Sequence, residues 1–90
     1  MGPVGERIRH KLQNAFSPQR LEVVDDSARH AGHAGAGEGG ESHFNVTVVA
    51  DTFLGLGRVE RQRRVHSALA EELAGPVHAL SLKLLAPGEV

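Results

Sequence analysis

The segment His43–Ala50 reads HFNVTVVA and decides the fold that this sequence predicts. Phe44, Val46 and Val48 alternate with polar residues. Because successive side chains of a β-strand point to opposite faces, this alternation predicts a strand with one buried face and one solvated face. The other predicted elements are arranged around this half-buried strand.

Two further strands and two helices are predicted on either side of it. A short β-branched run precedes it, and a run of alternating leucines follows it near the end of the chain. Apolar residues at every fourth position predict a helix at the start and another between the last two strands. The five ranges are Pro3–Ala15 (helix), Arg20–Asp26 (strand), His43–Ala50 (strand), Arg58–Leu73 (helix) and Val77–Leu84 (strand).

This order of elements predicts a small αββαβ domain of the α+β class. The first two strands form a hairpin and should be antiparallel, whereas the helical crossover makes the second and third strands parallel. Both helices then pack on one face of a three-stranded mixed sheet. With 90 residues, the chain 1–90 is expected to form one domain, with a flexible loop over residues 29–41.

Composition excludes several classes of function. The chain has no cysteine, so it offers no disulfide, no thiol nucleophile and no thiolate for a metal. A formal net charge of -1 provides no general attraction for nucleic acid or membranes. Asp25 and Asp26 are neighbours on a strand and point to opposite faces, which is unsuitable for a catalytic acid and base. We expect a protein that is not an enzyme and does not bind membranes, in the cytoplasm of a bacterium or as a mature organellar form.

The loop between the first two strands carries two histidines among glycines, in the run RHAGHAGAGEGGESHF from Arg29 to Phe44. Glycine leaves the backbone free to adopt positive φ, so His30 or His33 could be brought to a metal that a stiffer loop would not reach. Two imidazoles alone do not make a metal site, because further ligands must come from elsewhere in the fold. A mobile polar loop and a metal-binding arm are both compatible with this pattern.

Two histidines lie on predicted strands. His78 has the same parity as the leucines of the last strand, which predicts a partly buried residue at the end of that strand, with metal ligation as the alternative. His43 falls on the polar face of the central strand and is predicted to be solvated or hydrogen-bonded to another side chain.

An arginine cluster occupies the first turns of the second predicted helix. It could bind phosphate groups or a partner protein, or it could be an ordinary solvated face. Its members are Arg58, Arg61, Arg63 and Arg64.

Four stretches in this order, LEVVDDSARHAGH, ESHFNVTVVADTF, RQRRVHSALAEEL and GPVHALSL, resemble the BolA family from about Ile8 to Leu84. The resemblance implies an αββαβ domain related to the class II KH fold. It also implies a factor in iron-sulfur trafficking and iron regulation that binds a monothiol glutaredoxin and shares a [2Fe-2S] cluster with it. As an alternative, it implies a DNA-binding regulator of stress response and morphology, which here would use the arginine-rich second helix.

The resemblance also implies which residues hold the cluster. His78 matches the histidine of the VHAL motif, and His30 matches the loop ligand by its register after LEVVDDS, with His33 as a further candidate. The thiolates would come from a glutaredoxin cysteine and glutathione, so the protein alone would carry no cofactor and would be a monomer or a weak homodimer. A third interpretation is that the histidines bind a single divalent metal such as zinc without a partner.

The chain departs from the family pattern at two places. It reads Arg61-Gln62-Arg63-Arg64 where the family commonly has Arg-His-Arg, so no role is carried over to a histidine there. Soon after Pro87-Gly88 the sequence stops, so we expect the final helix of the family to be short or absent.

Overall fold

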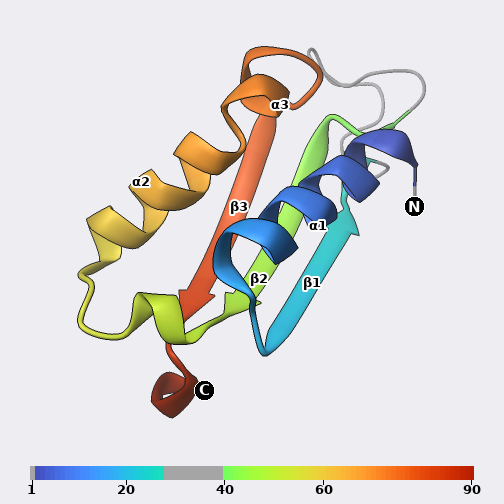
Figure 1. Cartoon of the computed structure of the whole chain (residues 1–90). Coiled ribbons are helices and arrows are strands. Elements are labelled where there is room, and N and C mark those ends of the chain that lie inside the picture. Colours follow the sequence, from blue (N-terminus) through green and yellow to red (C-terminus); the bar gives the residue numbers. More distant parts are fainter. Residues whose placement is uncertain (1, 28–39) are drawn as a thin grey trace.

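The computed structural model describes residues 2–27 and 40–90 and shows three strands with helices along one side (Figure 1). The predicted histidines His30 and His33 lie outside the described residues. The elements are α1 (Pro3–Phe16), β1 (Arg20–Asp25), β2 (His43–Val49), η2 (Asp51–Phe53), α2 (Arg58–Ala68), α3 (Ala70–Ala74), β3 (Ala79–Leu85) and η3 (Pro87–Glu89).

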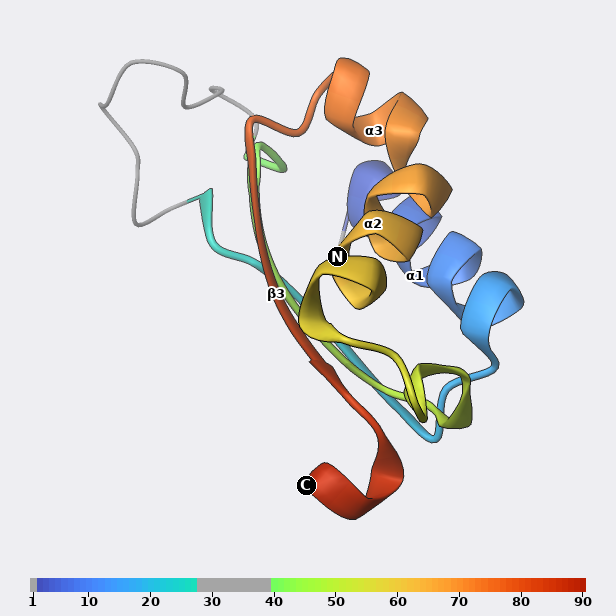
Figure 2. The ribbon, with the colours of Figure 1, turned by 90° about the vertical axis from the view of Figure 1, so that its left-hand side faces the viewer.

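The sheet has the predicted mixed topology. Its strand order is β1-β2-β3. The pair β1 and β2 is antiparallel, and the pair β2 and β3 is parallel. Figure 2 shows α1, α2 and α3 on the same side of the sheet. The α+β class and the arrangement of helices on one face are therefore confirmed.

The core lies between this face of the sheet and the helices. Phe44, Val46 and Val48 of β2 are buried, as the alternation in HFNVTVVA predicts. Phe53, at the end of the η2 turn, is fully buried, and its ring centroid lies 5.2 Å from that of Phe16. The helices add Ile8, Leu12, Phe16, Val65 and Leu69 to the same cluster.

The second predicted helix is two helices, so the prediction of one helix from Arg58 to Leu73 was wrong. The backbone leaves helical geometry at Leu69, where φ is -107° and ψ is 21°. Neither proline nor glycine stands at the break, so no local signal marked it. The bend is held from both sides, because the Leu69 side chain is fully buried and Glu72 of α3 is bound by α1.

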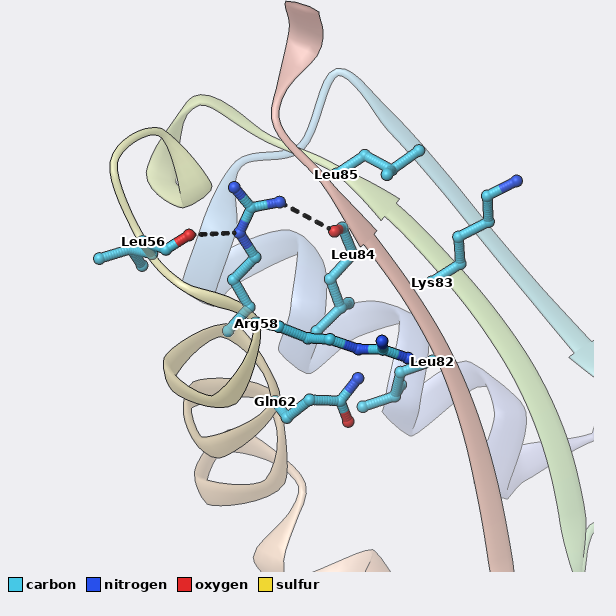
Figure 3. Close-up of a pocket in the computed structure, with 8 residues that line it drawn as sticks. Leu56, Arg58, Gln62, Leu82, Lys83, Leu84 and Leu85 are labelled. Atoms are coloured by element: carbon cyan, nitrogen blue, oxygen red, sulfur yellow. Dashed lines mark hydrogen bonds between the residues drawn. The ribbon is translucent and has the colours of Figure 1, made fainter. Parts of the chain in front are cut away.

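Arg61 connects α2 to the end of β3 and to the C-terminal turn η3. Its Nε donates to the Leu56 carbonyl at 2.9 Å and its Nη1 to the Leu84 carbonyl at 3.1 Å (Figure 3). The guanidinium also forms a two-pronged ion pair with Glu89, with Nη2 and Oε2 2.8 Å apart. The η3 segment itself is a single turn of 3-10 helix.

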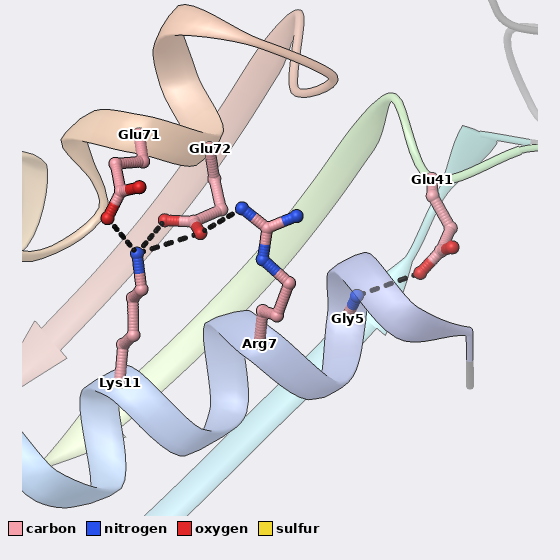
Figure 4. Close-up of polar contacts among 6 residues, drawn as sticks. All are labelled: Gly5, Arg7, Lys11, Glu41, Glu71 and Glu72. Carbon is pink, nitrogen blue, oxygen red and sulfur yellow. Dashed lines mark hydrogen bonds and ion pairs between the residues drawn. The ribbon is translucent and has the colours of Figure 1, made fainter.

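Glu72 anchors α3 to α1 through a buried carboxylate (Figure 4). Arg7 donates to its Oε2 at 2.8 Å, and Lys11 Nζ lies 3.0 Å from Oε1 and 2.9 Å from Oε2. Burial alone would raise the pKa of Glu72, but hydrogen bonds from Lys11 and Arg7 hold it below its ordinary value. Glu72 is thus an ionised buried group that depends on α1 for its partners.

Within the described part of the chain, no helix is long and apolar enough to cross a membrane.

Candidate functional site

His78 lies immediately before β3, at the end of the sheet. Its backbone N–H donates to the Ser42 carbonyl at 2.8 Å, and the N–H of Ala79 reaches the same oxygen at 3.2 Å. The imidazole is exposed, so the prediction that it is partly buried was wrong. Strand pairing begins one residue later, at Ala79, and the neighbouring Val77 occupies the buried position instead. An exposed imidazole at this position is accessible to a partner.

His43, the first residue of β2, lies beside His78. The two ring centroids are 6.4 Å apart, and His43 Nδ1 lies 2.8 Å from the hydroxyl oxygen of Ser42, which fixes the orientation of the ring. His43 pairs with Ala79 in the parallel register, so its neighbour across the strands is the residue next to His78. His43 was predicted to be solvated or bonded to a side chain, and its contact with the Ser42 hydroxyl confirms the second alternative. Its half-buried place next to His78 follows from a register that no single strand pattern contains.

Ser27 and Ser42 hold the two ends of the histidine-bearing loop together. The Ser27 hydroxyl oxygen accepts from the backbone N–H of Ser42 at 2.9 Å and from that of His43 at 3.2 Å. Both serines are buried. The loop therefore leaves and rejoins the fold directly beside His43, the histidine that contacts His78.

Asp25 reinforces the same junction. One of its carboxylate oxygens accepts from the N–H of Ser27 at 2.9 Å and the other from the N–H of Glu41 at 3.1 Å. Burial would raise the pKa of Asp25, but the hydrogen bonds from Ser27 and Glu41 lower it overall. Gly40 has a φ of +78°, a conformation that glycine adopts without strain, and a Cβ there would lie 3.3 Å from Asp25.

The loop junction is also tied to α1. The Glu41 carboxylate accepts from the backbone N–H of Gly5 at 2.8 Å, in the first turn of that helix (Figure 4). Because the N-terminal N–H groups of a helix lack intrahelical partners and carry partial positive charge, a carboxylate there stabilises the helix and fixes the loop end.

The donor set around His78 limits what the site can hold. Across residues 2–27 and 40–90, no group of three or more His, Asp or Glu side chains converges as a metal site would require. The described residues thus bring two imidazoles together, and a metal at this place needs further ligands from the loop or from a partner.

The predicted arginine cluster is divided by its contacts. Arg61 is only 12% exposed and is bound to Glu89, so it serves the fold. Arg63 and Arg64 form ion pairs with Glu60 on the same helix, at 3.5 and 3.2 Å. Arg58 is exposed and forms no ion pair with a described residue. A role for these residues in binding nucleic acid or a partner stays a prediction.

Comparison with known proteins identifies the family. The profile of the BolA-like protein family matches residues 12–89. BolA-like protein 1 from Homo sapiens is 47% identical over 89 residues, 99% of this chain and 62% of the relative, so the chain spans less than two thirds of that protein. The DNA-binding transcriptional regulator BolA from Escherichia coli is 51% identical over 79 residues, covering 88% of this chain and 71% of the relative.

A solved structure gives the same answer. The BolA domain of SufE1 from Arabidopsis thaliana superposes with a TM-score of 0.90 at 43% identity, covering 100% of this chain and 99% of that domain. The family profile, the sequence identity to relatives and the fold agree over nearly the whole chain, so this protein belongs to the BolA-like family.

Proposed function

We propose that this protein is a BolA-like factor of iron-sulfur trafficking and iron regulation that binds a monothiol glutaredoxin and holds a bridging [2Fe-2S] cluster jointly with it. His78 and one loop histidine, His30 or His33, are the ligands from this chain. The observation that carries the proposal is the exposed imidazole of His78 at the sheet end where both ends of the histidine-bearing loop are anchored.

Chain length supports His30 as the loop ligand. An extended chain advances at most about 3.6 Å per residue, so the three residues that lead from Ser27 to His30 can span at most roughly 11 Å. Ser27 itself bonds the backbone of His43, whose ring lies 6.4 Å from that of His78. His33 can be twice as far from Ser27, so His30 is the more tightly restrained candidate.

The histidines of this chain are suitable ligands for a [2Fe-2S] cluster. A cluster with one iron ligated by imidazole has a higher reduction potential than an all-thiolate cluster. With no cysteine in the chain, only nitrogen or oxygen ligands are available here, and glutaredoxin and glutathione would supply the thiolates. We further propose that the isolated chain carries no cluster and is a monomer or weak homodimer, acts without catalysing a reaction, and works in the cytoplasm.

Anaerobic reconstitution with a monothiol glutaredoxin, glutathione, iron and sulfide tests this proposal. Visible circular dichroism should show a mixed-complex spectrum that differs from that of glutaredoxin alone. His78→Ala and His30→Ala should abolish it, whereas His66→Ala, an exposed histidine on α2, should not. Identical spectra for wild type and His78→Ala would contradict the proposal, and loss with His33→Ala instead of His30→Ala would name the other loop ligand.

The same protein variants distinguish two other candidate functions from cluster binding. The name of the Escherichia coli relative favours DNA binding as the second candidate. It predicts DNA affinity that falls steeply with salt and is lost on neutralising Arg58, Arg63 and Arg64, with His78→Ala without effect. Tight stoichiometric zinc binding by the isolated chain would instead support a simple metal site.

A further inference from the structure

The outer edge of β3 is an unpaired strand edge. Because β3 lies at the end of the sheet order, β2 is its only partner strand among the described residues. Ala50 donates to the Leu85 carbonyl from the β2 side, whereas Arg61 donates to the Leu84 carbonyl from the other side. Since peptide groups alternate in direction along a strand, those of Leu80 and Leu82 also point outward. No described residue bonds these outward groups.

A groove runs beside this edge, between β3 and the start of α2. Its volume is about 440 Å³. In Figure 3, Arg58 and Gln62 of α2 extend toward Leu82 across the groove. The other lining residues are Leu56, Arg61 and the segment 83–85.

The groove is positively charged and apolar. Arg58 and Lys83 are exposed, and neither forms an ion pair with a described residue. Arg58 extends across the groove on the α2 side, whereas Lys83 points away from α2, from the opposite face of β3 (Figure 3). Leu56 and Leu82 supply apolar surface. Cations on both sides of a strand edge attract an oppositely charged partner and set its orientation.

One carboxylate already binds at the end of the groove. Glu89 accepts from the guanidinium of Arg61 and, at 2.9 Å, from the backbone N–H of Ala86. The hydrogen bond from Arg61 is the largest of the effects that lower the pKa of Glu89 to about 2. The chain thus shows in itself the chemistry that we assign to the groove, a carboxylate held by an arginine and by a backbone N–H just after β3.

We propose that the outer edge of β3 binds an extended acidic segment of a partner polypeptide. The segment adds a strand beside residues 79–83 and pairs with the peptide groups of Leu80 and Leu82. It carries carboxylates on both faces, against Arg58 on the α2 side and against Lys83 on the opposite side. A nucleic acid could satisfy the two cations but has no peptide groups for the strand edge, which is why a polypeptide is the better occupant. The histidines play no part in this site, so its test is independent of cluster binding.

A labelled peptide of repeated Val-Val-Glu-Glu is the probe, because neighbouring glutamates in a strand point to opposite faces and so reach both cations. Fluorescence anisotropy should detect its binding, and NMR hydrogen exchange should show that the amides of Leu80 and Leu82 become protected. A valine–lysine peptide should not bind, and neither should a valine–glutamate peptide that is N-methylated at every position. Because N–H groups alternate between the two edges of a strand, only full methylation removes the donors from both edges. Binding that survives N-methylation, or binding without protection of these amides, would overturn the proposal.

Charge variants locate the binding site. The double variant Arg58→Glu/Lys83→Glu should weaken binding about tenfold, since it reverses two exposed ion pairs. The control Arg9→Glu/Arg63→Glu changes the net charge equally, and neither of its residues lines the groove. Three results would each overturn the assignment. The two double variants could weaken binding equally, the Leu82 amide could become protected by self-association without peptide, or oligodeoxythymidine could displace the peptide.

Discussion

Replacing Glu72 by Ala should destabilise the protein, because it removes a buried carboxylate that Arg7 and Lys11 of α1 contact. The change removes contacts from Arg7 at 2.8 Å and from Lys11 at 2.9 and 3.0 Å. Buried charge-assisted hydrogen bonds contribute about 1.5–3 kcal/mol each. The two cations are 51% and 30% exposed, so water replaces much of what they lose. Including the void left by a fully buried side chain, we expect a total loss of about 2–3 kcal/mol.

Chemical denaturation followed by circular dichroism at neutral pH measures this loss. In a domain of this size it corresponds to a fall in Tm of roughly 10–20 °C. Glu71→Ala is the matched control, because Glu71 also contacts Lys11, at 3.1 Å, but its side chain is 81% exposed. Glu71→Ala should lower the free energy of unfolding by less than about 0.5 kcal/mol. Similar losses for the two variants would refute the argument that burial gives the Glu72 contact its strength.

The pH dependence gives a second check on Glu72. Its pKa in the folded protein lies below the ordinary value of 4.5, so the carboxylate stabilises the fold fully above that value. The stabilisation is lost as the pH falls through the lower, folded-state pKa. The stability difference between wild type and Glu72→Gln should therefore be constant near neutrality and shrink in acid; an increase in acid would contradict the assigned direction.

Three further changes test the core and the loop junction. Phe53→Ala should cost about 3–5 kcal/mol in urea unfolding because it empties a fully buried position, and a cost below 1 kcal/mol would mean that Phe53 is not in the core. Ser27→Ala should cost about 1–3 kcal/mol, since the N–H of Ser42 loses its buried acceptor, and should speed amide exchange at Ser42. In thermal unfolding, Gly40→Ala should lower the stability more than Gly55→Ala. Both glycines have positive φ, but only at Gly40 would the added Cβ meet a neighbouring atom. Equal effects of the two substitutions would contradict this.

The strands and the first helix could be predicted because their patterns report burial directly. Alternation in β2 and the fourfold spacing in α1 gave the buried residues Phe44, Val46, Ile8 and Leu12, and the element ends agree to within two residues. Each of these patterns depends only on neighbours along the chain, so no knowledge of tertiary contacts was needed.

Contacts between distant residues were not predictable in the same way. Glu72 follows Val65 by seven residues, so a single continuous helix would place both on one face, but the helix breaks at Leu69. From the sequence alone, a carboxylate at this position is expected to be solvated, because its partner is not known. That partner, Lys11, is 61 residues away in the chain. The same holds for Arg61, which seemed to be part of an exposed cluster and instead joins α2 to Glu89.

The candidate site was predicted in part. The family resemblance identified His78, whereas its strand parity alone suggested burial, because parity does not show where pairing begins. His43 was missed because its closeness to His78 depends on the register of two parallel strands. The signal available was that both histidines stand at the starts of strands expected to be parallel.

Direct detection of the nitrogen ligand is the measurement that tests cluster binding most closely. This chain alone would be labelled with an isotope of nitrogen in histidine, assembled with unlabelled glutaredoxin, glutathione, iron and sulfide, reduced, and examined by pulsed electron paramagnetic resonance. We predict strong coupling of the cluster to imidazole nitrogen that changes with the label and is lost in His78→Ala. A spectrum that is the same with and without the label would show that no histidine of this chain ligates the cluster, and would contradict the proposed function.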